Sequence, residues 1–199
     1  MFNSATSALI LVDYQTHLLP SIDEGNAVLG GAIFLAELTR LLDIPILGTE
    51  QNPEGLGPND ERIKNYCNQT VLKHSFNAVE SGLVGAIQKA NPLINQIVLA
   101  GCETHVCLMQ TALGLKENGY EVAVIPNACG SRAPSDKFLA IERMRAQSIP
   151  MLSIEMIIFE WLKNSNHPQF KNILQLIKNI LQLIKNVLQL IKNGIEKIK

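Results

Sequence analysis

The stretch of sequence that decides the fold is residues 96–108, QIVLAGCETHVCL, because it joins an apolar strand to a helix. Its first five residues are mostly apolar and typical of a buried strand. Thr104 can cap a helix that continues to Asn118, which places Cys107 in the first turn. Backbone N–H groups at that helix end would lower the pKa of the Cys107 thiol. The alternative is a structural cysteine that packs the helix against the sheet, because free cysteines are often buried.

Two charged residues follow two other apolar runs. Asp13 comes directly after ALILV at 8–12, and Lys73 comes directly after TVL at 70–72. The ends of parallel strands meet at one edge of a sheet, so we expect the carboxylate, the ammonium and the Cys107 thiol to lie together. Asp13 would take the thiol proton, while Lys73 would stabilise the thiolate and keep Asp13 ionised. Taken singly, Asp13 is also compatible with a turn cap and Lys73 with a solvated strand end.

Three separated motifs contain these residues: LVDYQ at 11–15, KHSF at 73–76, and GCETHVC at 101–107 followed by TA at 111–112. In them the chain resembles the isochorismatase-like cysteine hydrolases, a superfamily that includes isochorismatase, nicotinamidase and N-carbamoylsarcosine amidohydrolase. The resemblance implies a catalytic triad of Asp13, Lys73 and Cys107. It also implies a non-proline cis peptide between Cys102 and Glu103, which would help aim the backbone N–H groups of Glu103 and Cys107 into an oxyanion hole.

A narrower resemblance is to a branch of bacterial hydrolases and animal isochorismatase domain-containing proteins. The residues that carry it are TEQNPEGLGP at 49–58, NACGSR at 127–132, Asp136, Arg143 and HPQFK at 167–171. Together with the first three motifs, they extend the resemblance from residue 5 to about residue 178.

The substrate pocket is expected beside the nucleophile, because ligands of such sheets bind beyond the strand ends. The Gly- and Pro-rich loop after the second strand offers Glu50, Gln51 and Leu56 as lining residues. The same loop is also compatible with a rigid surface turn. Arg132 can bind a substrate carboxylate bidentately, although an ion pair with a neighbouring acid is an equal alternative.

The sequence predicts no catalytic metal and no cofactor. Nicotinamidase-type relatives carry an Asp and two His ligands after the second strand, whereas this chain has EQNP at 50–53 and no histidine between His17 and His74. Zinc needs three or four closely placed ligands, and Glu50 alone does not supply them. The four cysteines, at 67, 102, 107 and 129, have no paired CxxC spacing.

Apolar runs alternate with helical patterns along the chain. This alternation predicts a three-layer α/β/α Rossmann-like sandwich around a mostly parallel six-stranded sheet. We expect strands near 7–13, 44–49, 69–73, 95–101, 121–126 and 149–153, and helices near 27–42, 80–91, 106–118, 136–148 and 154–163.

Composition is typical of a cytoplasmic enzyme. The chain has 199 residues, of which 47% are hydrophobic and 18% charged, so it can bury one substantial core, and we assign the hydrolase domain to residues 1–170. A formal net charge of -1 gives no reason to expect a nucleic-acid partner. No apolar stretch is long enough to span a bilayer, and the first ten residues do not have the pattern of a secretory signal. Unpatterned cysteines indicate a reducing compartment.

The end of the chain is a tandem heptad repeat. NILQLIK occurs at 172–178 and at 179–185, and NVLQLIK follows at 186–192. We therefore predict a C-terminal amphipathic helix over residues 171–199, with an apolar stripe about 160° wide. Six Lys and one Glu give this segment a charge of +5, against -6 for residues 1–170. Such a helix can bind another helix, an acidic surface of the same oligomer or an anionic membrane, of which the membrane is the less favoured partner. The later copies of the repeat are compatible either with self-association or with a frayed extension of the chain.

The leading functional hypothesis is a cysteine hydrolase that acts on a small amide or a related small molecule, in a homo-oligomer. The isochorismatase branch instead cleaves a vinyl ether, by resemblance, and needs no covalent thioester. The alternative from a different class is a non-enzymatic oligomeric scaffold in which the helical tail recruits a partner. The Asp13, Lys73 and Cys107 set argues against the scaffold, because scaffolding does not require it.

Overall fold

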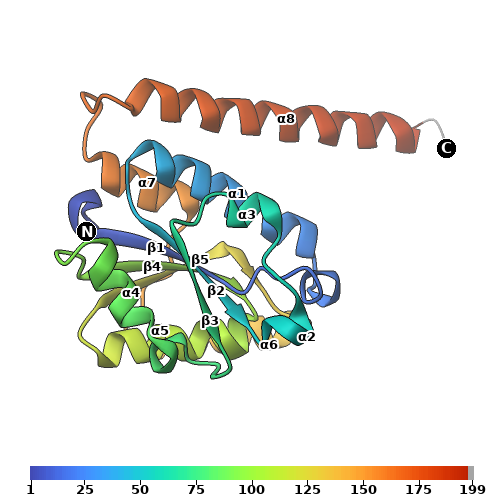
Figure 1. Cartoon of the computed structure of the whole chain (residues 1–199). Helices are drawn as coiled ribbons and strands as arrows, with labels where there is room; N and C mark the ends of the chain where they lie inside the picture. Colours follow the sequence, from blue (N-terminus) through green and yellow to red (C-terminus); the bar gives the residue numbers. More distant parts are fainter. Residues whose placement is uncertain (197–199) are drawn as a thin grey trace. The chain divides into compact units, whose positions relative to one another are not determined.

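The computed structural model describes residues 1–196, and its centre is a parallel sheet of five strands (Figure 1). The order across the sheet is β3-β2-β1-β4-β5, and each neighbouring pair is parallel. The central strand β1 is buried along its whole length, as expected for a strand covered on both faces. The strands are β1 (Ser7–Val12), β2 (Ile46–Gln51), β3 (Gln69–Lys73), β4 (Gln96–Cys102) and β5 (Glu121–Gly130).

The prediction of a sixth strand near 149–153 is wrong. Met151 forms only an isolated parallel bridge with Val124 at the edge of the sheet. Pro150 has no N–H group that could donate to a neighbouring strand. Its carbonyl accepts from the Val124 N–H, and the Leu152 N–H donates to the Val124 carbonyl, each at 3.0 Å. The chain then enters a helix at Ile154, so the pairing does not extend into a strand.

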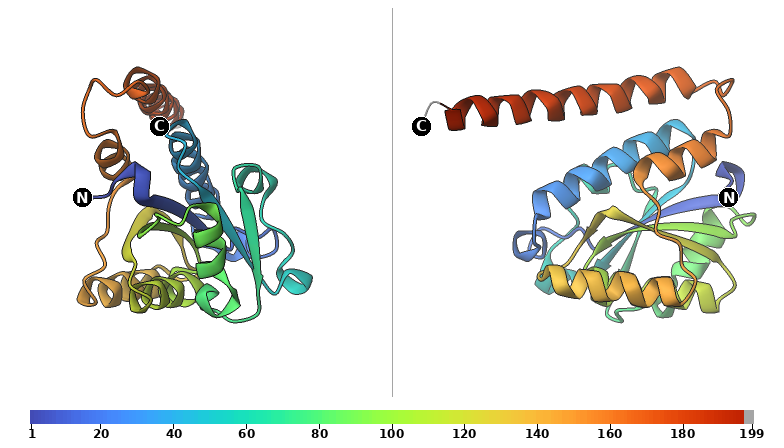
Figure 2. Two further views of the ribbon diagram at one scale, coloured as in Figure 1. Left: turned by 60° about the vertical axis from the view of Figure 1, so that its left-hand side comes forward. Right: turned by 180° about the vertical axis from the view of Figure 1, so that it is seen from behind.

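Helices cover both faces of the sheet (Figures 1 and 2). α1 and α7 lie on one face, and α4, α5 and α6 lie on the other, which confirms the α/β sandwich with a parallel sheet. The helices are α1 (Gly25–Leu41), α2 (Pro53–Leu56), α3 (Glu61–Lys64), α4 (Leu83–Ala90), α5 (Met109–Glu117), α6 (Pro134–Ala146) and α7 (Ile154–Leu162). Short 3-10 turns occupy Ser4–Thr6, Leu19–Ser21 and Ala78–Ser81, and a π-helical turn occupies Thr104–Leu108.

The topology brings four strand ends to one edge of the sheet. Asp13 follows β1, Gln51 ends β2 and Lys73 ends β3, while β4 leads into the turn that carries Cys107. The register pairs Val12 with Thr49, and Gln51 with Lys73, so these ends are level. Parallel pairing therefore places the predicted site residues at the same edge.

The chain divides into two compact units, Met1–Trp161 and a second that begins at Leu162. In the first unit, the Trp161 indole N–H donates to Ser7 Oγ at 3.0 Å, which fastens α7 to the start of β1. The second unit contains α8 (Phe170–Glu196). The domain boundary after residue 170 stays a prediction, and the two compact units divide earlier, after Trp161. Within residues 1–196, no helix is long and apolar enough to cross a membrane.

Candidate active site

Asp13 is the buried acid of the candidate site. It follows β1 with a left-handed backbone (φ 52°), and its N–H donates to the Thr49 carbonyl at 3.2 Å. Its Oδ1 accepts from Thr49 Oγ1 at 2.6 Å, and its Oδ2 accepts from Lys73 Nζ at 2.7 Å. Asp13 is fully buried. Two donors on two neighbouring strands therefore hold the carboxylate in one orientation.

Lys73 is the buried cation that pairs with this acid. Its side chain is fully buried, although lysine is rarely buried unless it is paired. Besides the bond to Asp13, its ammonium group donates to Gln51 Oε1 at 2.8 Å. The alternative of a solvated lysine at a strand end is therefore wrong.

Gln51 connects the cation with the thiol. Its Nε2 donates to the carbonyl of His74 at 2.7 Å, which turns Oε1 toward Lys73 and toward Cys107 Sγ, 3.9 Å away. Its backbone N–H donates to Gln15 Oε1 at 2.8 Å, and its carbonyl accepts from Gln15 Nε2 at 2.9 Å. The sequence placed Gln51 in the substrate pocket, and the structure places it against two of the three predicted catalytic residues.

The two other residues proposed for the pocket, Glu50 in β2 and Leu56 in α2, have structural contacts. The buried Glu50 carboxylate accepts from the backbone N–H of Asn59 at 2.8 Å, so it fastens the end of the loop. Leu56 ends the short helix α2 and is partly exposed, and its carbonyl accepts from the His17 N–H at 3.0 Å. The role of Glu50 and Leu56 in binding a substrate stays a prediction.

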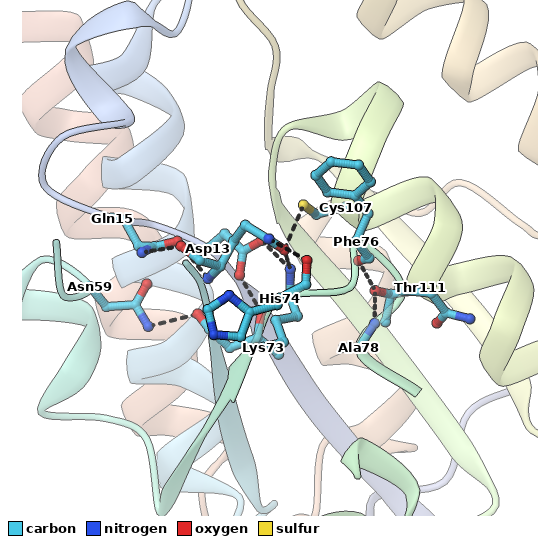
Figure 3. A network of polar contacts seen from close by, with 12 residues as sticks. Asp13, Gln15, Asn59, Lys73, His74, Phe76, Ala78, Cys107 and Thr111 are labelled. Carbon is cyan, nitrogen blue, oxygen red and sulfur yellow. Dashed lines mark hydrogen bonds and ion pairs between the residues drawn. The ribbon is translucent and has the colours of Figure 1, made fainter. Parts of the chain in front are cut away.

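Cys107 lies in the π-helical turn directly before α5. The predicted Thr104 cap is wrong, because Thr104 Oγ1 donates to the Gly130 carbonyl at 3.0 Å and caps no backbone N–H. Thr104 thus ties the turn to β5. Figure 3 shows the Cys107 side chain directed toward the cluster that contains Asp13 and Lys73.

The expected low pKa of the nucleophile is also contradicted. The pKa of the Cys107 thiol is raised to about 12: burial raises it most, the negative charge of Asp13 also raises it, and Lys73 lowers it. Burial is also the main reason why the pKa of Cys129 and the pKa of Cys67 are raised to about 12. What distinguishes Cys107 is therefore its acid and cation neighbours, and the resting thiol carries its proton.

The turn before Cys107 has an unusual backbone. The peptide bond between Cys102 and Glu103 is cis, at the position that the resemblance implied. Gly101, two residues before Glu103, has φ +157°, and a Cβ there would collide with the Val12 carbonyl. Glycine therefore lets β4 approach β1 closely, directly before Asp13. The oxyanion hole of the Glu103 and Cys107 N–H groups stays a prediction.

Arg132 is paired with an acid of the chain. Its Nε donates to Glu103 Oε1 at 2.9 Å, and its backbone N–H donates to the same oxygen at 3.2 Å. This is the ion pair that the sequence offered as the alternative to a substrate contact. The Arg132 side chain is 63% exposed, so it borders solvent beside the turn that carries Cys107.

Sequence reasoning missed the residues that hold the cluster in place, above all Thr49 and Gln15. Thr49 is a polar residue inside an apolar strand, and Gln15 is the second residue after Asp13. Both are fully buried. A buried polar residue needs hydrogen-bond partners, so polar side chains in or next to buried strands were the available signal.

Over residues 1–196, no three His, Cys, Asp or Glu side chains gather in a way that could hold a metal ion. The absence of a metal from the reaction stays a prediction based on the sequence of the loop after β2.

Comparison with known proteins identifies the family. The family model of the Isochorismatase domain matches residues 7–156, which include Asp13, Lys73 and Cys107. The chain belongs to the isochorismatase family. It is 36% identical over 175 residues to isochorismatase domain-containing protein 2A of Mus musculus, covering 86% of this chain and 82% of that protein. It is 32% identical over 176 residues to isochorismatase family protein 1A of Dictyostelium discoideum, with 86% and 85% covered.

Solved structures show the same fold. The MAR1 ribonuclease of Caenorhabditis elegans has a TM-score of 0.81 and 28% identity, with 88% of this chain and 91% of that chain covered. YcaC of Escherichia coli, described as an octameric hydrolase of unknown specificity, has a TM-score of 0.77 at 22% identity, with 90% and 97% covered. The resemblance to the isochorismatase-like cysteine hydrolases is thus confirmed, and homologues of this family support a hydrolase. The narrower bacterial branch stays a prediction.

Proposed function

We propose that this isochorismatase-family protein hydrolyses a small amide through a thiol nucleophile, Cys107. The observation that carries the proposal is the buried cluster in which Lys73 Nζ lies 2.7 Å from Asp13 Oδ2 and 2.8 Å from the Gln51 oxygen that also faces Cys107. An acid, a cation and a thiol in such a cluster can perform nucleophilic acyl transfer.

In the first half of the reaction, the Cys107 S–H proton passes to the Asp13 carboxylate while Sγ attacks the substrate carbonyl carbon. The resulting oxyanion would accept hydrogen bonds from the backbone N–H groups of Glu103 and Cys107. The C–N bond then breaks, the amine leaves with the proton that Asp13 had taken, and the acyl group stays on sulfur as a thioester.

In the second half, water attacks the thioester carbonyl and gives a proton to Asp13. The C–S bond breaks, the carboxylic acid product leaves, and the proton returns to the Cys107 sulfur. Lys73 balances the negative charge that moves between Asp13 and sulfur throughout both halves.

The raised pKa of Cys107 fits a base that acts during the attack. A thiol with a pKa of about 12 is almost entirely protonated at neutral pH, so a standing thiolate does not supply the nucleophile. Asp13 both disfavours the thiolate before the reaction and accepts its proton during it. Proton transfer and attack are therefore coupled at this site.

The remaining parts of the proposal come from the sequence. Glu50, Gln51, Leu56 and Arg132 would border the substrate, which is a small molecule, and the reaction would need no metal or cofactor. We expect a homo-oligomer in the cytoplasm, with neither nucleic acid nor a membrane as partner. The octameric state described for the E. coli YcaC structure is compatible with a homo-oligomer.

The proposal is tested with a panel of small primary amides, by measuring carboxylate release and the mass of the intact protein during turnover. We expect an acyl adduct on Cys107, and loss of turnover in Cys107→Ala and Cys107→Ser. Cys67→Ala is the matched control, because Cys67 is a thiol with a similarly raised pKa but lies outside the cluster. Turnover that survives Cys107→Ala would contradict the proposal.

The same experiment distinguishes the alternatives. Turnover of a vinyl ether without a covalent adduct would favour isochorismatase-type chemistry, and an absence of turnover across the panel would favour the scaffold. An RNA oligonucleotide is included because the C. elegans neighbour is described as a ribonuclease. We expect it to stay intact, because residues 1–170 carry a net charge of -6.

A further inference from the structure

The heptad repeat lies outside the hydrolase domain. The Isochorismatase domain match ends at residue 156, whereas the three copies of the repeat occupy residues 172–192. They form one continuous helix, α8, in the structure. The chemistry proposed above uses no residue of this helix, so its sequence needs a separate explanation.

The spacing of the repeat assigns each residue a heptad position. Ile173 and Ile180 occupy d, and Ile177 occupies a, because successive isoleucines are separated by four and then three residues. Leucines fill both flanking positions, e and g. Only b, c and f are polar, as Lys, Asn and Gln. Isoleucine at both a and d favours three or four helices over two, and apolar e and g positions widen the stripe beyond a two-helix seam.

Two pairs of polar side chains on α8 bond to each other within the helix. Gln175 Nε2 donates to Asn179 Oδ1 at 2.8 Å, and Gln182 Nε2 donates to Asn186 Oδ1 at 2.9 Å, one turn later in each case. The same f-to-c bond therefore recurs in successive copies. Recognition of a partner then falls to the apolar face, where Leu181 of the second copy is 47% exposed, whereas Ile173 and Ile177 of the first copy are buried.

The available area sets the number of helices. An apolar arc of about 160° on a helix of about 5 Å radius is about 14 Å wide, and two heptads extend about 21 Å, which gives about 290 Å² per helix. Two helices would bury at most about 590 Å² together, which is below the roughly 1,200 Å² of a stable interface. Four helices would bury about 1,200 Å² and reach that value.

We propose that the second and third copies of the repeat bind the same segment of further copies of this chain, in a bundle of at least four α8 helices. This bundle joins the protomers into an assembly larger than the Met1–Trp161 unit forms by itself. The single Lys of each copy lies at the outward b position, so like charges do not face one another inside the bundle.

A second copy of the chain fits this face better than a lipid surface. Helices that lie on membranes are rich in Lys or Arg on the polar face and commonly carry Trp or Phe on the apolar face. Each copy here has one Lys, and residues 171–199 contain no aromatic residue. Isoleucine repeated at a and d is instead the pattern of helices that pack on one another.

The test compares the mass in solution of the full chain with that of a chain stopped after Lys178, at equal protomer concentration, by sedimentation velocity and light scattering. Ile180→Glu places a charge on the apolar stripe. Gln182→Glu introduces the same residue at the exposed f position and is the matched control. Circular dichroism checks that all four proteins remain folded.

We expect the full chain and the Gln182→Glu variant to form an assembly of at least four protomers. We expect the Ile180→Glu variant to have the smaller mass that the chain stopped after Lys178 has. Equal masses for the full and stopped chains would overturn the proposal, and so would a full-size assembly of Ile180→Glu. If the full chain has the same mass as the stopped chain but floats with vesicles of phosphatidylglycerol and phosphatidylcholine, the apolar stripe binds a membrane instead.

Discussion

At the scale of single residues, the candidate site depends on charges that are buried together. The Asp13 and Lys73 side chains are fully removed from solvent, and each compensates the charge of the other at 2.7 Å. Removing one partner of such a pair leaves an uncompensated buried charge, which is far more costly than removing both. The same pair controls the thiol, because Asp13 raises the pKa of Cys107 and Lys73 lowers it.

Lys73→Met is therefore expected to lower the free energy of unfolding by about 3–5 kcal/mol, because the Asp13 carboxylate remains buried without its cation. The double variant Asp13→Asn/Lys73→Met removes both charges and should recover part of this loss. Urea unfolding followed by circular dichroism measures both effects. If the two substitutions were additive, the pair would not be coupled.

Gln15→Leu tests the support of Gln51. Gln15 bonds to the Gln51 N–H, the Gln51 carbonyl and the Gly57 carbonyl, so its removal leaves buried backbone groups unpaired. We expect a loss of about 1–3 kcal/mol in the free energy of unfolding. Gln88→Leu is the control, because Gln88 is exposed on α4. Equal unfolding midpoints for the two variants would contradict a supporting role for Gln15.

The sequence was informative about Asp13, Lys73 and Cys107, because each follows an apolar strand that a simple pattern reveals. It was misleading about the state of the thiol. The raised pKa of Cys107 comes from burial and from Asp13, and the extent of burial appears only once the chain is folded. Thr104 was wrongly assigned as a cap because its hydroxyl bonds across to Gly130, a contact that local sequence does not reveal.

At the scale of elements, parallel pairing decides where the chemistry lies. β1 pairs with both β2 and β4, and the close approach at Gly101 brings the end of β4 against Val12, directly before Asp13. Hydrophobic runs predicted all five strands of the sheet. The sixth was overpredicted because residues 149–153 also resemble a strand, while Pro150 and the start of α7 restrict the pairing to one bridge.

Gly101→Ala is expected to separate the ends of β1 and β4, because its Cβ would collide with the Val12 carbonyl and its φ of +157° disfavours other residues. We expect a loss of about 1–3 kcal/mol in stability. Gly85→Ala is the control: nothing lies within 4 Å of a Cβ there, and alanine in α4 should stabilise by about 0.5–1 kcal/mol. Thermal unfolding compares the two variants, and an unchanged midpoint for Gly101→Ala would count against the close approach.

At the scale of the whole molecule, the chain combines a hydrolase unit with a repetitive helix of opposite charge. Two hydrogen bonds attach the end of α7 to the N-terminal segment of the hydrolase unit. The Glu160 carboxylate accepts from the Phe2 N–H at 2.7 Å, and the Trp161 indole donates to Ser7. The heptad pattern predicted a helix over residues 171–199, and α8 occupies Phe170–Glu196, while residues 197–199 lie outside the described residues. The sequence did not identify the binding partner of this helix, because an apolar stripe can bind several kinds of surface.

A chain stopped after Lys178 is expected to unfold in one cooperative transition, because it retains α7 and its bonds to the N-terminal segment. A chain stopped after Ser153 loses α7 and should fail to show this transition. Far-ultraviolet circular dichroism during heating measures both chains. Cooperative unfolding of the Ser153-stopped chain would show that α7 is dispensable for the hydrolase unit.

The central claim is that Cys107 reacts under the joint control of Asp13 and Lys73. The most direct test is the rate at which iodoacetamide labels Cys107 between pH 7 and pH 10, followed by peptide mass spectrometry with Cys67 as the internal reference. In the parent chain, the rate should rise about tenfold per pH unit, because the thiolate is a minor species below a pKa of about 12. Asp13→Asn removes the neighbouring anion, so labelling at a given pH should become at least about tenfold faster, while Lys73→Met should slow it by a similar factor. Rates at Cys107 that follow those at Cys67 in both variants would contradict the account.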